Sequence, residues 1–147
     1  MCIVFSHQAK SSHGFWSTLK LQPLLHDEVV CFKALITIHK LLRDGHPAVL
    51  RESLNEETYL KTLANPPMRS RAKGYLDLIQ SYVRFLLIKL EFHRTHPEFS
   101  GNMSYDDYVS LRRANNPNEG YTTVIELMQL QTEVLALVAN GAHRHLF

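Results

Sequence analysis

The histidines are the residues of this chain best suited to chemistry, because their charge changes close to neutral pH. His39 lies in the stretch FKALITIHKLLRDGHP, residues 32–47, where apolar residues recur at helical spacing. No Ser, Cys or Asp stands at a local spacing that would make His39 the base of a nucleophile. We therefore interpret His39 as a buried, neutral residue of a helical core with a structural hydrogen bond.

A second group of histidines has the spacing of metal ligands. His93 and His96 are three residues apart and lie close to Glu91. They fall just before Pro97, however, and no second ligand cluster is evident elsewhere in the sequence. We interpret the pair as a solvated helix end and predict no metal site.

Basic residues gather at two places where they could meet an anion. The densest run is Arg69, Arg71 and Lys73 in ANPPMRSRAKG, a segment that two prolines mark as a loop. His7 and Lys10 lie in the polar stretch SHQAKSSH, which we also expect to be a loop. Either group is a solvated loop or a contact for an acidic partner or a lipid head group.

Composition excludes several classes of protein. Sixteen Lys and Arg stand against 14 Asp and Glu, and a net charge of +2 is too small for a nucleic-acid binder. The sequence contains no Gly-rich phosphate loop, nucleophile elbow or paired carboxylates, so we predict neither an enzyme nor a cofactor. Two cysteines favour a reducing compartment, and no apolar run approaches the roughly 20 residues of a membrane span. We expect a soluble cytosolic protein.

The pattern of apolar residues is helical almost throughout, and no segment alternates with period two. Asp27 is predicted to cap the helix that contains His39, and Gly45 to end it in the left-handed conformation. The stretch NNPNEG is expected to form a turn. Further helices are predicted over residues 14–21, 48–54, 72–94, 104–113 and 121–139, with another short one after residue 55.

Two of these helices are apolar on more than one side, which predicts neighbours on two sides of each. A stack of helices provides such neighbours, so the sequence predicts an all-α, irregular helical superhelix without a fixed repeat. The predicted core residues are Leu35, Ile36, Leu42, Ile79, Val83 and Leu86.

FKALITIHKLLRDGHPAVL, residues 32–50, resembles the signature helix pair of the ANTH domain in endocytic adaptors related to huntingtin-interacting protein, in particular their fungal actin-patch member. Three further stretches carry the resemblance: CIVFSHQAKSSHGFWSTLKLQPL, YVRFLLIKLEFHRTHPEF and YDDYVSLRRANNPNEGYTTVIELMQLQ. The match covers about residues 2–138.

The resemblance implies an ENTH/ANTH/VHS-like solenoid and a phosphoinositide-binding membrane adaptor of clathrin-mediated endocytosis, without catalytic activity. It implies a cytoplasmic location at the plasma membrane, in cortical actin patches and clathrin-coated pits. The implied partners are phosphatidylinositol 4,5-bisphosphate and the ENTH domain of epsin. Clathrin and actin would be bound through regions of full-length relatives that have no counterpart here.

The chain also departs from the family pattern. The family's lysine-rich lipid motif lies just upstream of the residues matched by CIVF, and VANGAHRHLF leaves the pattern at the other end. Residues 1–147 are therefore expected to be a partial ANTH domain, with an incomplete first helix and without the C-terminal helices. Lipid binding by the chain alone is expected to be poor, with His7, Lys10, Arg69, Arg71 and Lys73 as weak contacts. The alternative function is a lipid-independent, VHS-like scaffold that binds proteins. A third hypothesis is a metal-dependent hydrolase that uses the histidines.

Overall fold

The computed structural model describes residues 1–65, 74–104 and 117–142, and all regular elements in these ranges are helices. The predicted all-α class is confirmed. In chain order the elements are α1 (Cys2–Ala9), α2 (His13–Lys20), the 3-10 turn η1 (Leu24–His26), α3 (Glu28–Asp44), α4 (Ala48–Ser53), the 3-10 turn η2 (Leu54–Glu56), α5 (Glu57–Ala64), α6 (Leu76–Thr95) and α8 (Pro117–Ala142).

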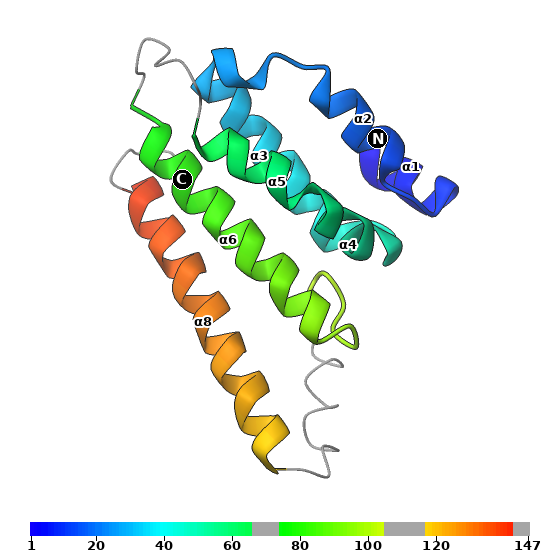
Figure 1. The fold of residues 1–147 in the computed structure, drawn as a ribbon, viewed down its shortest axis with the longest axis vertical. Helices are drawn as coiled ribbons and strands as arrows, with labels where there is room; N and C mark the ends of the chain where they lie inside the picture. Colours follow the sequence, from blue (N-terminus) through cyan, green and yellow to red (C-terminus); the bar gives the residue numbers. More distant parts are fainter. Residues whose placement is uncertain (66–73, 105–116, 143–147) are drawn as a thin grey trace.

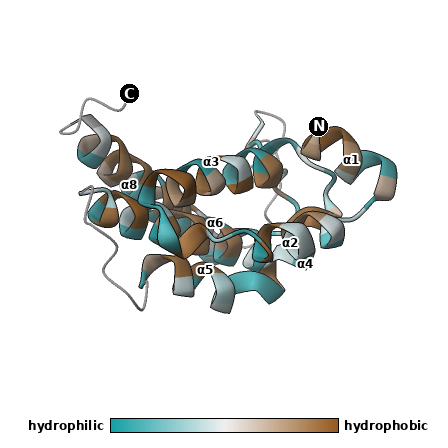
Figure 2. Cartoon of the chain, turned by 90° about the horizontal axis from the view of Figure 1, so that it is seen from above, coloured by the Kyte–Doolittle hydropathy of each residue, from teal (hydrophilic) through white to brown (hydrophobic). Residues whose placement is uncertain are grey.

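The helices form an irregular stack with α6 inside it. Helix α6 contacts α8 along one side and α3, α4 and α5 along others, while α1 and α8 lie at opposite ends of the array (Figures 1 and 2). A helix with neighbours on several sides must be apolar on several sides, which explains why α6 has apolar residues on more than one face. The predicted superhelix is confirmed.

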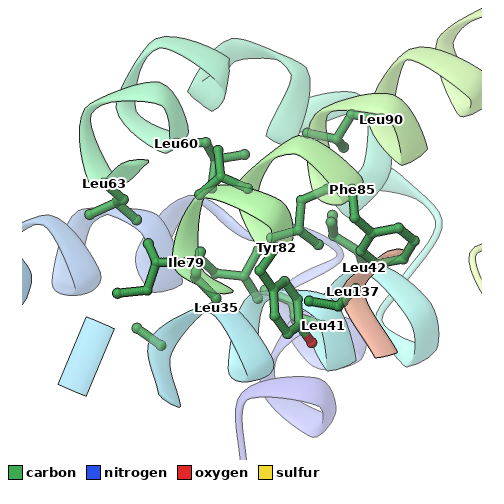
Figure 3. Close-up of a cluster of buried hydrophobic side chains, with 14 of the residues drawn as sticks. Leu35, Leu41, Leu42, Leu60, Leu63, Ile79, Tyr82, Phe85, Leu90 and Leu137 are labelled. Carbon is green, nitrogen blue, oxygen red and sulfur yellow. The ribbon is translucent and has the colours of Figure 1, made fainter. Parts of the chain in front are cut away.

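The core contains most of the residues expected there, and Figure 3 shows how α3, α5 and α6 meet in it. Ile36 is the exception, because it is only partly buried and packs against the margin of the core. The buried face of α3 is centred on Leu35, Ile38 and Leu42, so a residue one position beyond Leu35 stands at its edge. The confirmed core predictions are Leu35, Leu42, Ile79, Val83 and Leu86.

The two ends of α3 show one correct prediction and one wrong one. The Asp27 carboxylate accepts hydrogen bonds from the backbone N–H groups of Val29 (2.8 Å) and Val30 (3.2 Å), so it is the predicted cap. Gly45 is not left-handed, because its φ of −76° and ψ of 175° are those of extended backbone. Glycine is needed there for space, since a Cβ would lie 2.4 Å from the Leu41 carbonyl oxygen.

Several predicted boundaries differ from the structure. The long helix begins at Leu76 rather than residue 72, and residues 117–120 of the expected turn NNPNEG belong to the start of α8. Proline suits the first turn of a helix, where its missing N–H has no partner to lose. Ser6–Ala9 of the expected loop SHQAKSSH are helical in α1. The helix expected over residues 104–113 lies, from residue 105 onward, outside the described residues.

Helix α8 contains a stretch, Gly120–Gly141, that is long and apolar enough to cross a membrane by length and composition alone. The expectation that no apolar run approaches the length of a membrane span is therefore wrong for α8. Only 22% of it is buried in the structure, but both of its acidic side chains contact basic side chains outside α8. Glu133 pairs with Arg84 of α6 at 2.9 Å, and Glu126 pairs with His96. These contacts describe an amphipathic helix lying against α6.

Candidate lipid-binding surface

The N-terminal pair of candidate residues is carried by α1. His7 lies in the last turn of α1, and Lys10 follows as its left-handed cap residue, with φ of 51°. The His7 Nε2 atom is 3.0 Å from the backbone oxygen of Asp44, at the carboxyl end of α3. Because its ring is engaged with the protein, His7 is less available to an external ligand than the exposed Lys10.

A serine and a glycine determine how closely α1 approaches α3. The Ser6 hydroxyl accepts a hydrogen bond from the His46 backbone N–H at 3.2 Å. A Cβ on Gly45 would stand 3.2 Å from the same oxygen, so the small residue allows this approach. The position of Lys10 is thus determined by packing against the α3–α4 turn.

The loop after α1 is secured by one carboxylate of α4. The Glu52 carboxylate oxygen accepts from the Ser11 hydroxyl (3.1 Å) and from the N–H (2.6 Å) and hydroxyl (2.8 Å) of Ser12. Burial would raise the pKa of Glu52, but these hydrogen bonds to the charged form outweigh it and the pKa is lowered. The backbone next to Lys10 is therefore well ordered by α4.

Arg69, Arg71 and Lys73 lie outside the described residues, so their predicted role stays a prediction. Just beyond them in the chain, the Tyr75 N–H donates to the Glu28 carboxylate at the start of α3, at 2.8 Å. His7 contacts the other end of α3. At a rise of about 1.5 Å per residue, the first and last of the 17 residues of α3 are separated by about 24 Å.

His39 is half-buried rather than fully buried, and it has the structural hydrogen bond that was predicted. Its Nδ1 atom lies 2.9 Å from the Tyr82 hydroxyl of α6, and its ring stacks edge-on against Phe85. Burial is the main cause that lowers the pKa of His39 to about 4, and the positive charges of Lys89 and Arg43 add to it. The ring is therefore neutral near pH 7.

We expect the fold to lose stability as the pH falls from about 6.5 to about 4. The folded pKa of His39 lies below the unfolded value, so the unfolded chain binds the proton first. Among the described residues, the charges of Lys89 and Arg43 oppose protonation of His39 and that of Asp44 favours it. Urea denaturation of the parent and of His39→Gln across this range would test this. The substitution should flatten the curve, and an NMR pKa for His39 above 6.5 would contradict the assignment.

Two basic side chains beside His39, those of Lys89 and Arg43, were not predicted from the sequence. The Lys89 side chain is only 4% exposed, and its Nζ donates to the Gly101 carbonyl at 2.7 Å and approaches His93 Nε2 at 3.2 Å. Burial, helped by the Arg43 charge, lowers the pKa of Lys89 to about 8. Lys89 follows Phe85 by one turn on the buried face of α6. A lysine at this position of an apolar face could have indicated a buried charge from the sequence.

The prediction of a solvated helix end at His93 and His96 is wrong. His93 is 6% exposed, and the His96 ring lies between Glu126 of α8 and Glu98. The reason is tertiary, since α8 and the residues following α6 cover this end of the helix. Among the described residues, no group of three or more His, Cys, Asp or Glu side chains is placed to hold a metal ion.

Comparison with known families identifies this arrangement. A family model described as the ANTH domain matches residues 1–139. The chain belongs to the ANTH domain family. The resemblance seen in the helix-pair signature is thereby confirmed, and the ANTH domain accounts for nearly all of the chain.

Curated relatives of this ANTH domain include fungal and human proteins. It is 48% identical over 134 residues to "Endocytosis protein end4" of Schizosaccharomyces pombe, covering 90% of this chain and 12% of that protein. It is 41% identical over 131 residues to "Protein SLA2" of Saccharomyces cerevisiae, covering 88% and 13%. Huntingtin-interacting protein 1 of Homo sapiens is 37% identical over 106 residues, covering 72% and 10%. The chain thus spans about an eighth of the two fungal relatives.

Two solved structures share the fold. A chain of the structure described as the ENTH domain from epsin-2 in complex with phosphatidylinositol 4,5-bisphosphate superposes with a TM-score of 0.86 at 48% identity, covering 92% of this chain and 53% of that one. A chain of the endocytic adaptor complex AENTH superposes with a TM-score of 0.82 at 39% identity, covering 94% and 56%. This ANTH domain chain therefore corresponds to about half of each matched chain.

Proposed function

We propose that this chain is part of a phosphoinositide-binding membrane-adaptor module of clathrin-mediated endocytosis. The observation that carries the proposal is the ANTH match over residues 1–139, together with 48% identity to an endocytosis protein. The choice of phosphatidylinositol 4,5-bisphosphate is supported by the solved complex with that lipid, which has the same fold. No catalytic role is part of the proposal.

The proposal includes a cellular setting, which the endocytosis proteins among the relatives support in general terms. The module would act in the cytoplasm at the plasma membrane, in actin patches and clathrin-coated pits, and would meet an epsin ENTH domain. Clathrin and actin would be bound by other regions of a longer protein. Residues 1–147 would form one part of the ANTH domain, with the lysine-rich lipid motif of the family upstream of α1.

Within the chain, Lys10 is the proposed lipid contact with the best support. It is exposed, it follows α1 directly, and the backbone beside it is fixed by Glu52. His7, Arg69, Arg71 and Lys73 remain proposed weak contacts. A single surface lysine contributes on the order of 1 kcal/mol to attraction by an anionic membrane, so Lys10 alone would give only weak binding.

A second candidate function is a lipid-independent, VHS-like protein scaffold. Exposed apolar side chains on α8 favour it, including those of Ile125, Met128 and Leu135. Such side chains in one region of a surface are typical of a protein contact. The two functions differ in whether membrane binding needs the phosphoinositide.

Vesicle co-sedimentation would test the proposal. We expect residues 1–147 to bind vesicles containing phosphatidylinositol 4,5-bisphosphate weakly, and the same chain preceded by the first-helix segment of the fission-yeast relative to bind them strongly. Several cations converging on one head group explain the difference, and added salt should weaken the binding.

Lys10→Gln should reduce the residual binding of the short chain, whereas Lys33→Gln, which removes an exposed charge from α3, should not. An extended chain that sediments equally with and without the phosphoinositide would refute the adaptor function. That result would favour the protein scaffold.

A further inference from the structure

A small cleft opens between α3, α6, the turn at residues 101–103 and α8. Its volume is about 220 Å³, below the roughly 300 Å³ at which pockets for drug-sized ligands begin. The cleft is therefore suited to a small group rather than to a large ligand. Its polar lining is formed by His39, Arg43, Lys89, Asn102 and Gln131, and its apolar wall by side chains of α6 and α8.

The described part of the lining carries positive charge. Among the described residues that line the cleft, Lys89 and Arg43 are the charged ones, and none is an Asp or Glu. Asp44 lies nearby and contacts Arg43 at 3.5 Å, but this is an exposed pair of adjacent residues. Such a pair contributes little in water, so it leaves the Arg43 guanidinium able to bind another anion.

Lys89 is the residue that most needs an anion. Buried charges in proteins are usually paired, because removing a charge from water is costly. Among the described residues Lys89 has only neutral polar partners, the Gly101 carbonyl and the His93 ring. These use two of its three protons, which leaves one for a ligand in the cleft.

Neutral donors complete the lining. The Asn102 side-chain oxygen accepts from the Ser100 hydroxyl and the Ser104 N–H. Its amide N–H₂ has no acceptor among the described residues and can donate to a ligand. Gln131 of α8 presents a second amide. The His39 ring has its Nδ1 atom engaged with Tyr82, which leaves Nε2 for a ligand.

We propose that this cleft is a binding site for a small phosphate-bearing anion, held by Lys89 and Arg43 and by the amides of Asn102 and Gln131. A phosphate has several acceptor oxygens, and charge-assisted hydrogen bonds to Lys and Arg are the strong kind. The same chemistry could come from a soluble phosphate monoester or from a phosphorylated lipid head group. The site does not depend on the adaptor function proposed above.

The test uses two matched variants of α8. Gln131→Glu places a carboxylate in the lining, and Gln129→Glu makes the same charge change at an exposed position outside it. Titration with inorganic phosphate at constant ionic strength, followed by NMR, should give saturable shifts at the Gly101 and Asn102 amides. We expect Gln131→Glu to weaken binding about tenfold and Gln129→Glu less than about twofold.

Arg43→Gln should also weaken binding. Because the Arg43 side chain is 63% exposed, this substitution should leave the fold intact. Shifts that do not saturate, or that are equal in the two α8 variants, would overturn the proposal. Inositol 1,4,5-trisphosphate and vesicles with the lipid separate the two sources. Vesicle binding that falls in Gln131→Glu but not in Gln129→Glu indicates the head group, and unchanged vesicle binding with loss of phosphate binding indicates a soluble ligand.

Discussion

Replacing Leu86 with alanine is expected to lower the free energy of unfolding by about 2–5 kcal/mol. Leu86 has no exposed surface and lies within the core that α6 shares with its neighbouring helices. The substitution removes buried apolar contacts and leaves a cavity that rigid helices on several sides cannot fill. Domains ordinarily have a free energy of unfolding of about 5–15 kcal/mol, so the variant would lose a large part of its stability. Urea denaturation followed by circular dichroism measures the change.

The matched control for Leu86 is Ile125 on the outer face of α8. Its side chain is 64% exposed, so Ile125→Ala should change stability by less than about 0.5 kcal/mol. Leu35→Ala, at an equally buried position of α3, should resemble Leu86→Ala. If the Leu86 variant unfolds at the same urea concentration as the parent, the assignment of the inner face of α6 is wrong.

The helices could be predicted because their signals are local. The spacing of Leu35, Ile38 and Leu42 marks one face of a helix, and Asp27 caps that helix through its own side chain. The double apolar stripe of α6 also predicted the stack, since it requires neighbours on several sides. These properties depend on residues within a few turns of each other.

Features that depend on distant residues could not be predicted in this way. Gly45 reads as a left-handed helix end, but its role is set by the carbonyl of Leu41 and by Ser6 from another helix. His93 was predicted to lie at a helix end in solvent, but it is buried beside Lys89, whose ammonium donates to the Gly101 carbonyl beyond the helix. Each position thus depends in part on a residue from another segment, Ser6 or Gly101, which the local pattern does not contain.

Among the candidate binding residues, too, some could be predicted from local sequence and others could not. Lys10 could be chosen from sequence because a lysine in a polar stretch is usually exposed, and it is. The basic cleft could not, because Arg43 and Lys89 are brought together only by the packing of α3 against α6. His39 was recognised as part of the core, yet the charges that lower its pKa come from this same cluster.

Replacing Gly101 with alanine is expected to destabilise the protein by about 1–3 kcal/mol or more, by overpacking. A Cβ at Gly101 would lie 2.0 Å from the Leu42 carbonyl oxygen and 3.0 Å from that of Arg43. Neither oxygen can move easily, because both belong to the last turn of α3. The turn would have to withdraw, and its carbonyl would then leave the ammonium of Lys89, which is buried. A buried donor that loses its acceptor adds to the cost.

Replacing Gly120 with alanine should instead increase the stability of the protein. Gly120 lies in the first turns of α8, and nothing stands within 4 Å of the place its Cβ would take. Alanine loses less backbone freedom than glycine on forming a helix, so Gly120→Ala should stabilise the protein by up to about 1 kcal/mol. Thermal unfolding of the two variants beside the parent gives the comparison. Because both changes add one methyl group, a Gly101→Ala protein as stable as Gly120→Ala would show that the turn at residues 101–103 does not pack against the end of α3.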